Sequence, residues 1–181
     1  MKKFIWSLFM AAIFFVNSVA SAAYEETITE DADFASIKKL AVALPLHYKV
    51  EITEPTADEF GDILSNAGRL AENITVISYD DIVDMLWEDI KIDIKALNEK
   101  ESRKIFNENI SKYADAYVTA TSANNNRFLQ IFFEVRDSKT GKIMYVFNTQ
   151  SRNYGKNLKG YTKASEDFYK RFNSVIKKNR K

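Results

Sequence analysis

The sequence contains no cysteine and one histidine, His47, among 181 residues. Without thiols it can form no disulfide, thiolate nucleophile or iron–sulfur cluster, and one imidazole cannot build an H-E-x-x-H motif or a histidine-rich zinc site. A Ser-His-Asp triad would have to use His47, and no G-x-S-x-G motif accompanies it. A lone histidine is more often a structural or surface residue. We therefore expect no catalytic, metal-ligating or cofactor-binding residues and no cofactor.

Glycine and proline are also scarce. The five glycines never cluster, which excludes a P-loop and a dinucleotide-binding loop, and there are two prolines. No internal repeat, low-complexity tract or linker is visible. The sequence therefore predicts one domain, which aromatic residues, at 13% of the chain, can supply with a core.

The N-terminus has the order of parts of a secretory signal. Lys2 and Lys3 precede an apolar run, Phe4 to Val16, and Ala20-Ser21-Ala22 supplies small residues for cleavage. The run falls short of the roughly 20 apolar residues that span a membrane. We expect residues 1–22 to be a cleaved signal peptide, with Ala23 as the alternative last residue. Because no cysteine follows that could carry a lipid, and no second apolar span exists, we expect a chain free in the bacterial periplasm or secreted.

Charge is distributed unevenly along the chain. Residues 24–116 carry 21 Asp and Glu against 10 Lys and Arg, whereas residues 117–181 carry 4 acids against 14 bases. Three interpretations stay open. The first is that the two portions attract each other inside the fold, and the second is that the C-terminal part binds an anionic partner. A third is that acids coat one set of helices and bases another, without functional meaning.

Hydrophobic periodicity predicts an α/β domain over residues 37–181, preceded by an extended segment, 23–36. Thr56, Ser78 and Asn98 each precede a helix-type apolar pattern and suit N-caps, and Ile82, Val83, Leu86 and Trp87 are the apolar residues of the second helix. A last amphipathic helix covers about 161–178. Strands are predicted over 37–44, 74–78, 116–122, 128–136 and 142–150, with a hairpin turn at 137–141. The order β-α-β-α-α-β-β-β-α favours one mixed sheet of about five strands covered by helices.

Several segments resemble a family of envelope modules. They are the strand 37–44, the strand 74–78 running into Asp80-Asp81, the segment 113–118, the strand 133–141 ending in Thr140-Gly141, and the aromatic-rich last helix. In order and character they resemble the α/β domain shared by the N-terminal part of TolB, the CsgG core and the penicillin-binding-protein activator LpoB. The resemblance implies non-enzymatic docking onto other envelope proteins or self-association. It transfers no functional residue, because the lipidated cysteine of CsgG and LpoB and the propeller of TolB are missing.

Three functional hypotheses follow. The first is an exported, non-enzymatic protein–protein interaction or assembly module of the bacterial envelope, whose partner is another envelope protein or a second copy. The second is a small secreted hydrolase using Asp80, Asp81 and Asp84, although acids at a helix start also favour the helix dipole and the cap. The third binds an anionic envelope polymer or lipid surface through the basic last helix, with Lys170, Arg171, Lys177 and Lys178. We expect no nucleic-acid partner, because the chain is exported and no binding motif is present.

Overall fold

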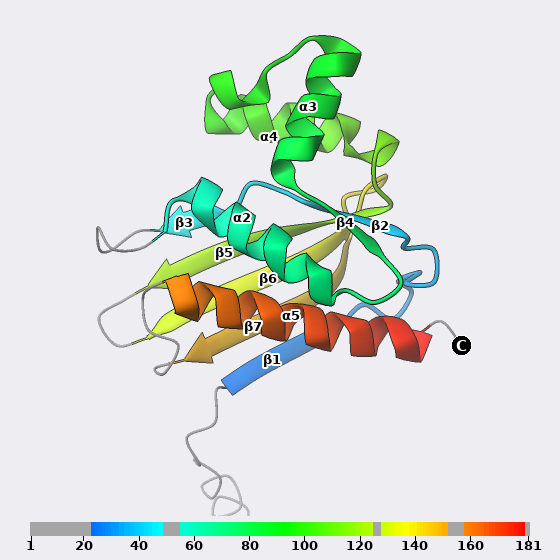
Figure 1. The fold of residues 1–181 in the computed structure, drawn as a ribbon. Helices are drawn as coiled ribbons and strands as arrows, with labels where there is room; N and C mark the ends of the chain where they lie inside the picture. Colours follow the sequence, from blue (N-terminus) through cyan, green and yellow to red (C-terminus); the bar gives the residue numbers. More distant parts are fainter. Residues whose placement is uncertain (1–22, 49–54, 125–127, 152–157, 180–181) are drawn as a thin grey trace, which may run out of the picture.

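A computed structural model describes residues 23–48, 55–124, 128–151 and 158–179 of the chain (Figure 1). The predicted signal peptide, 1–22, lies outside the described residues. Along the chain the strands and helices are β1 (Ala23–Ile28), β2 (Lys39–Val42), β3 (Leu46–Tyr48), α2 (Ala57–Ala67), β4 (Thr75–Ile77), α3 (Tyr79–Ile90), α4 (Glu99–Asn109), β5 (Ala116–Asn124), β6 (Leu129–Asp137), β7 (Ile143–Ser151) and α5 (Leu158–Asn179). Short 3-10 turns follow α2, α3 and α4 at Gly68–Leu70, Ile94–Ala96 and Ile110–Lys112.

The strands form one mixed sheet in the order β1-β7-β6-β5-β2-β4, with β3 also paired to β5. Strands β2 and β4, β2 and β5, and β3 and β5 run parallel, whereas β5, β6, β7 and β1 pair antiparallel. This confirms the predicted α/β class with a mixed, helix-covered sheet. The sheet has seven strands, where about five were expected.

The two additional strands have identifiable causes. The first predicted strand, 37–44, is observed as β2, which ends at Val42. Pro45, which lacks an N–H, lies in the break, and the chain then resumes as β3 and continues along β5, with Leu46 opposite Thr121. Strand β1 comes from the segment 23–36 and pairs with β7, with Ala23 opposite Gln150. That pairing joins residues far apart in the sequence, so no local pattern indicates it.

Local signals place the helices as the sequence predicts. The hydroxyl of Thr56 accepts the N–H of Glu59, and the Glu59 carboxylate accepts the N–H of Thr56, a complete capping box at the start of α2. The glycine after this helix is required for packing, because a Cβ on Gly68 would lie 2.7 Å from a methyl group of Val76. The hairpin between β6 and β7 turns at Gly141, whose φ of 69° favours glycine.

Helices α2 and α5 cover one face of the sheet, while α3 and α4 form a separate layer near β2 and β4 (Figure 1). The larger core lies under α2 and α5 and is rich in aromatic rings: Phe168 stacks on Phe133 with centroids 4.8 Å apart and on Phe172 at 5.7 Å. The smaller core lies under α3 and α4, where Phe106 meets Tyr117 edge to face at 5.8 Å. Among the described residues no helix is both long and apolar enough to cross a membrane.

Candidate functional site

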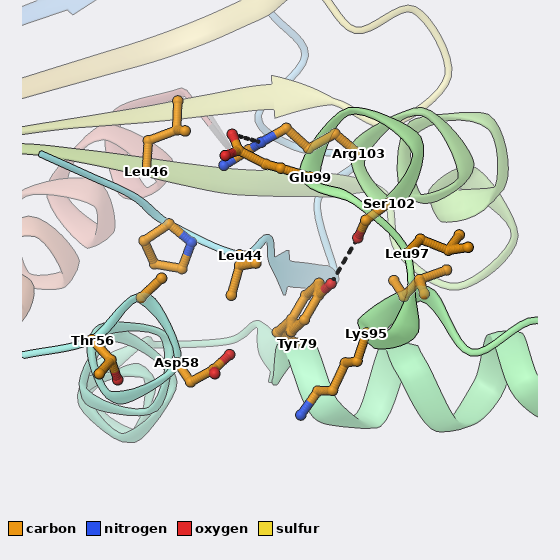
Figure 2. Close-up of a pocket in the computed structure, with 13 residues that line it drawn as sticks. Leu44, Leu46, Thr56, Asp58, Tyr79, Lys95, Leu97, Glu99, Ser102 and Arg103 are labelled. Atoms are coloured by element: carbon orange, nitrogen blue, oxygen red, sulfur yellow. Dashed lines mark hydrogen bonds and ion pairs between the residues drawn. The ribbon is translucent and has the colours of Figure 1, made fainter.

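A crevice of about 560 Å³ lies at the carboxyl ends of β2 and β4 (Figure 2). After β2 the chain passes through α2 to β4, and after β4 it passes through α3 and α4 to β5, on the other side of β2. Open α/β sheets bind ligands at such a reversal of strand order. The crevice is lined by Leu44, Pro45, Leu46, Thr56, Ala57, Asp58, Tyr79, Ile94, Lys95, Leu97, Glu99, Ser102 and Arg103.

The centre of the crevice is Tyr79, the first residue of α3. Its ring lies between Leu44 and Lys95, and its hydroxyl shares a hydrogen bond of 3.2 Å with the buried Ser102 hydroxyl of α4 (Figure 2). Burial raises the pKa of Tyr79, and the Ser102 hydrogen bond opposes this only in part. The phenol is therefore neutral near neutral pH, and the pair acts as a brace between α3 and α4.

Three of the four charged side chains that line the crevice take part in ion pairs, one of them with Asp80 outside the lining. The Lys95 ammonium lies 2.7 Å from an Asp80 oxygen, and Arg103 lies 3.1 Å from Glu99. The hydrogen bond to Asp80 raises the pKa of Lys95, so this lysine stays charged. No histidine or cysteine is among the lining residues, and the Ser102 hydroxyl meets a phenol, not a base.

The three helix-start carboxylates do not converge on one site. Asp81 completes the cap of α3: its carboxylate accepts the Ser78 N–H at 3.2 Å and the Ser78 hydroxyl at 2.7 Å. Asp80 pairs with Lys95, and Asp84 is exposed farther along the helix. The capping interpretation of Asp81 is confirmed. Among the described residues no group of three or more His, Asp or Glu side chains could hold a metal ion.

The other candidate, His47, lies in β3 with its backbone opposite Ser122. Its side chain is outside the described part of the structure.

The outer face of α3 carries a residue whose role the sequence did not indicate. Trp87 was assigned to the apolar residues of the helix, yet its side chain is 51% exposed, unlike Ile82, Val83 and Leu86, which are buried. It lines a shallow hollow of about 380 Å³ together with Asp80, Val83, Asp84, Asp93 and Lys95. A helical wheel could have indicated this surface, because Asp80, Asp84 and Trp87 are spaced four and three residues apart and therefore lie on one stripe of the helix.

Helix α5 presents exposed basic side chains on the other side of the molecule. Arg171 lies 3.7 Å from Glu26 and 4.0 Å above the ring of Tyr24, and Lys177 lies 2.6 Å from Glu72. Lys163 and Lys170 pair within the helix, with Asp167 and Glu166. The acidic and basic portions of the chain therefore meet at some positions inside the fold, through Glu26 and Glu72.

Comparisons with known protein families and with characterised proteins found no match. Among solved structures, the PelC dodecamer from Paraburkholderia phytofirmans is similar, with a TM-score of 0.51 at 11% identity, over 86% of this chain and 98% of that chain. The LpoB C-terminal domain from Escherichia coli has a TM-score of 0.48 at 12% identity, over 80% and 93%. TolB from Acinetobacter baumannii has a TM-score of 0.40 at 8% identity, over 82% of this chain and 29% of that one. The chain thus shares its fold with PelC, and LpoB and TolB, which the sequence was expected to resemble, are among the similar solved structures.

Proposed function

We propose that this chain is an exported, non-enzymatic interaction module of the bacterial envelope that binds a protein partner through the outer face of α3. The observation that carries the proposal is the exposure of Trp87, at 51%, in a hollow lined by Asp80, Asp84 and Asp93. Tryptophan is among the residues most enriched at the positions where truncation weakens protein interfaces.

Two further points support an interaction module. The N-terminal segment has the composition of a secretory signal, which supports export. PelC, which has the same fold, forms a dodecamer, so the fold is compatible with assembly through its surfaces.

The rival hypotheses have weaker or separate support. A hydrolase built on Asp80, Asp81 and Asp84 would need carboxylates free to act, but Asp81 caps α3 and Asp80 is bound to Lys95. Binding of an anionic polymer concerns α5, which is a different surface.

The proposal can be tested by photo-crosslinking of the full chain in its native cell. A photoreactive amino acid at the exposed position Glu88, next to Trp87, should give a crosslinked protein adduct. The same photoreactive amino acid placed at Lys139, an exposed position in the β6–β7 hairpin, is the matched control. The adduct at Glu88 should disappear when Trp87→Ala is added. An equal adduct at both positions, or none at Glu88, would show that the α3 face binds no protein.

A further inference from the structure

We infer that the protein bound by the outer face of α3 is a second copy of this chain, which docks by the basic face of its α5, so that copies associate head to tail. The inference rests on the proposed function and names its partner. The acidic face of α3 comprises Asp80, Asp84, Trp87 and Glu88. The basic face of α5 comprises the exposed residues Lys159, Lys163, Lys170, Arg171, Lys177 and Lys178.

The two helices are complementary in charge. Helix α3 contains five carboxylates, Asp80, Asp81, Asp84, Glu88 and Asp89, and no basic residue. Helix α5 contains its six basic residues and only two acids, Glu166 and Asp167. Surfaces of opposite charge attract and orient each other when two molecules meet, whereas surfaces of like charge repel each other. Acidic against basic is therefore the favoured contact between copies, and acidic against acidic is disfavoured.

The two faces cannot meet within one molecule. Helix α3 lies in the layer near β2 and β4. Helix α5 lies along β6 and β7, and α2 lies between the two helices (Figure 1). The intramolecular acids that reach α5 from other elements include Glu26 and Glu72, which lie near Arg171 and Lys177. Lys163 and Lys170 pair with acids four residues away on the exposed helix surface. Such exposed pairs contribute little, so these lysines can exchange their partners for carboxylates of another copy.

The hollow at Trp87 suits a lysine side chain. Its indole face attracts an ammonium group by a cation–π interaction, while Asp84 and Asp93 supply negative charge beside Asp80, which already pairs with Lys95 of the same hollow. The aliphatic stem of a lysine covers apolar ring surface at the same time. The chain already uses this chemistry internally, where the Arg171 guanidinium lies 4.0 Å from the centre of the Tyr24 ring.

A contact between two different faces is heterologous. After the first contact one copy still has its basic face free and the other still has its acidic face free, so association continues until a ring closes or a filament grows. A pair of copies related by a two-fold axis would instead bury the same face twice.

The test is a charge-swap experiment on the full chain as the cell produces it, followed by sedimentation or light scattering. One variant reverses α3 (Asp84→Lys with Glu88→Lys), and another reverses α5 (Lys170→Glu with Lys178→Glu). Each alone should weaken self-association about tenfold or more, because like charges then face each other. An equimolar mixture of the two should restore it, as should all four changes in one chain. The control for the α3 variant, Glu25→Lys with Glu108→Lys, makes the same net change of charge at exposed sites away from both faces and should leave association intact.

Further measurements distinguish a second copy of the chain from another protein or an anionic polymer as the partner. Wild-type association should weaken as salt is raised, and Trp87→Ala should weaken it at low salt. If neither variant weakens association, or if the mixture fails to restore it, the head-to-tail contact is wrong. If the chain stays monomeric while Glu88 still crosslinks to a different protein, the inference fails and the proposed function stands. Retention of a monomeric chain on heparin resin, lost with Lys170→Glu and Lys178→Glu, would make α5 a polymer-binding face and overturn the contact.

Discussion

Single aspartates hold much of the backbone at the ends of strands. Asp115 accepts the N–H groups of Lys38 and Lys39, at 2.8 and 2.9 Å, and so fixes the entry to β2. In the β6–β7 hairpin Asp137 accepts the N–H groups of Lys139 and Thr140 and the Thr140 hydroxyl. Residues of this type favour turns because their short side chains satisfy nearby backbone donors. Asp115, one of the acids that make residues 24–116 strongly negative, is thus structural.

The hairpin carboxylate should make stability depend on pH. Partial burial raises the pKa of Asp137, but hydrogen bonds from Thr140 and Lys139 outweigh it and hold the pKa below its ordinary value of 3.8. Because the folded pKa is lowered, its stabilisation is fully present above 3.8 and is lost as pH falls through the folded value. We expect Asp137→Asn to lose less stability than the wild type between about pH 6 and about pH 3 in urea unfolding. Thr140→Val should be intermediate, and an unchanged pH dependence in both would contradict the assignment.

At the scale of the element, α3 shows how one helix divides its acids between roles. Asp81 stabilises the helix start through the Ser78 cap, Asp80 reaches Lys95 of the following 3-10 turn, and Asp84 stays exposed beside Trp87. Buried Ile82 and Leu86 hold the opposite side of the helix against the smaller core. The proposed interaction surface is therefore built on an element that is anchored both at its cap and by its apolar side.

Because Asp81 and Asp84 have different roles, we expect their substitution to lower the free energy of unfolding by different amounts. Asp81→Ala should lower the free energy of unfolding by about 1 kcal/mol, because the cap loses its reciprocal hydrogen bonds. Asp84→Ala should change it by less than about 0.5 kcal/mol. Urea unfolding at protein concentrations where the chain is monomeric measures both. Equal costs would mean that Asp81 does not act through the cap.

At the scale of the whole molecule, one aromatic cluster joins the two ends of the chain. Phe168 of α5 contacts Phe133 of β6 and Phe147 of β7, and Phe172 reaches Phe34, between β1 and β2. Strand β1 is tied to the same helix by the contacts of Arg171 with Glu26 and Tyr24. The antiparallel half of the sheet and the last helix therefore form one packed unit.

Truncation in this cluster should be costly. Phe168 is fully buried, so Phe168→Ala should lower the free energy of unfolding by about 3 to 5 kcal/mol, through lost burial and the cavity left behind. Leu158→Ala, at a position 53% exposed on the same helix, is the matched control and should cost less than about 0.5 kcal/mol. Chemical denaturation measures both, and a small effect at Phe168 would show that α5 is not held by this core.

The sequence alone predicted what depends on neighbours along the chain. Caps at Thr56, Ser78 and Asn98, the two-residue period of β5 to β7, and the turn before Gly141 are local, because a side chain there meets backbone within a few residues. The absence of cysteine likewise determined which chemistry is impossible. The predicted signal peptide rests on residues outside the described structure.

Only the tertiary structure decided which residues meet across long separations. It paired β1 with β7, continued the sheet past Pro45, left Trp87 exposed, and placed α3 and α5 in separate layers over separate cores. A helical pattern shows which residues share a stripe, but exposure depends on whether another element covers that stripe. In α3 the smaller core covers the side of Ile82 and Leu86, and no such cluster of described residues covers the stripe of Asp84 and Trp87, which is exposed.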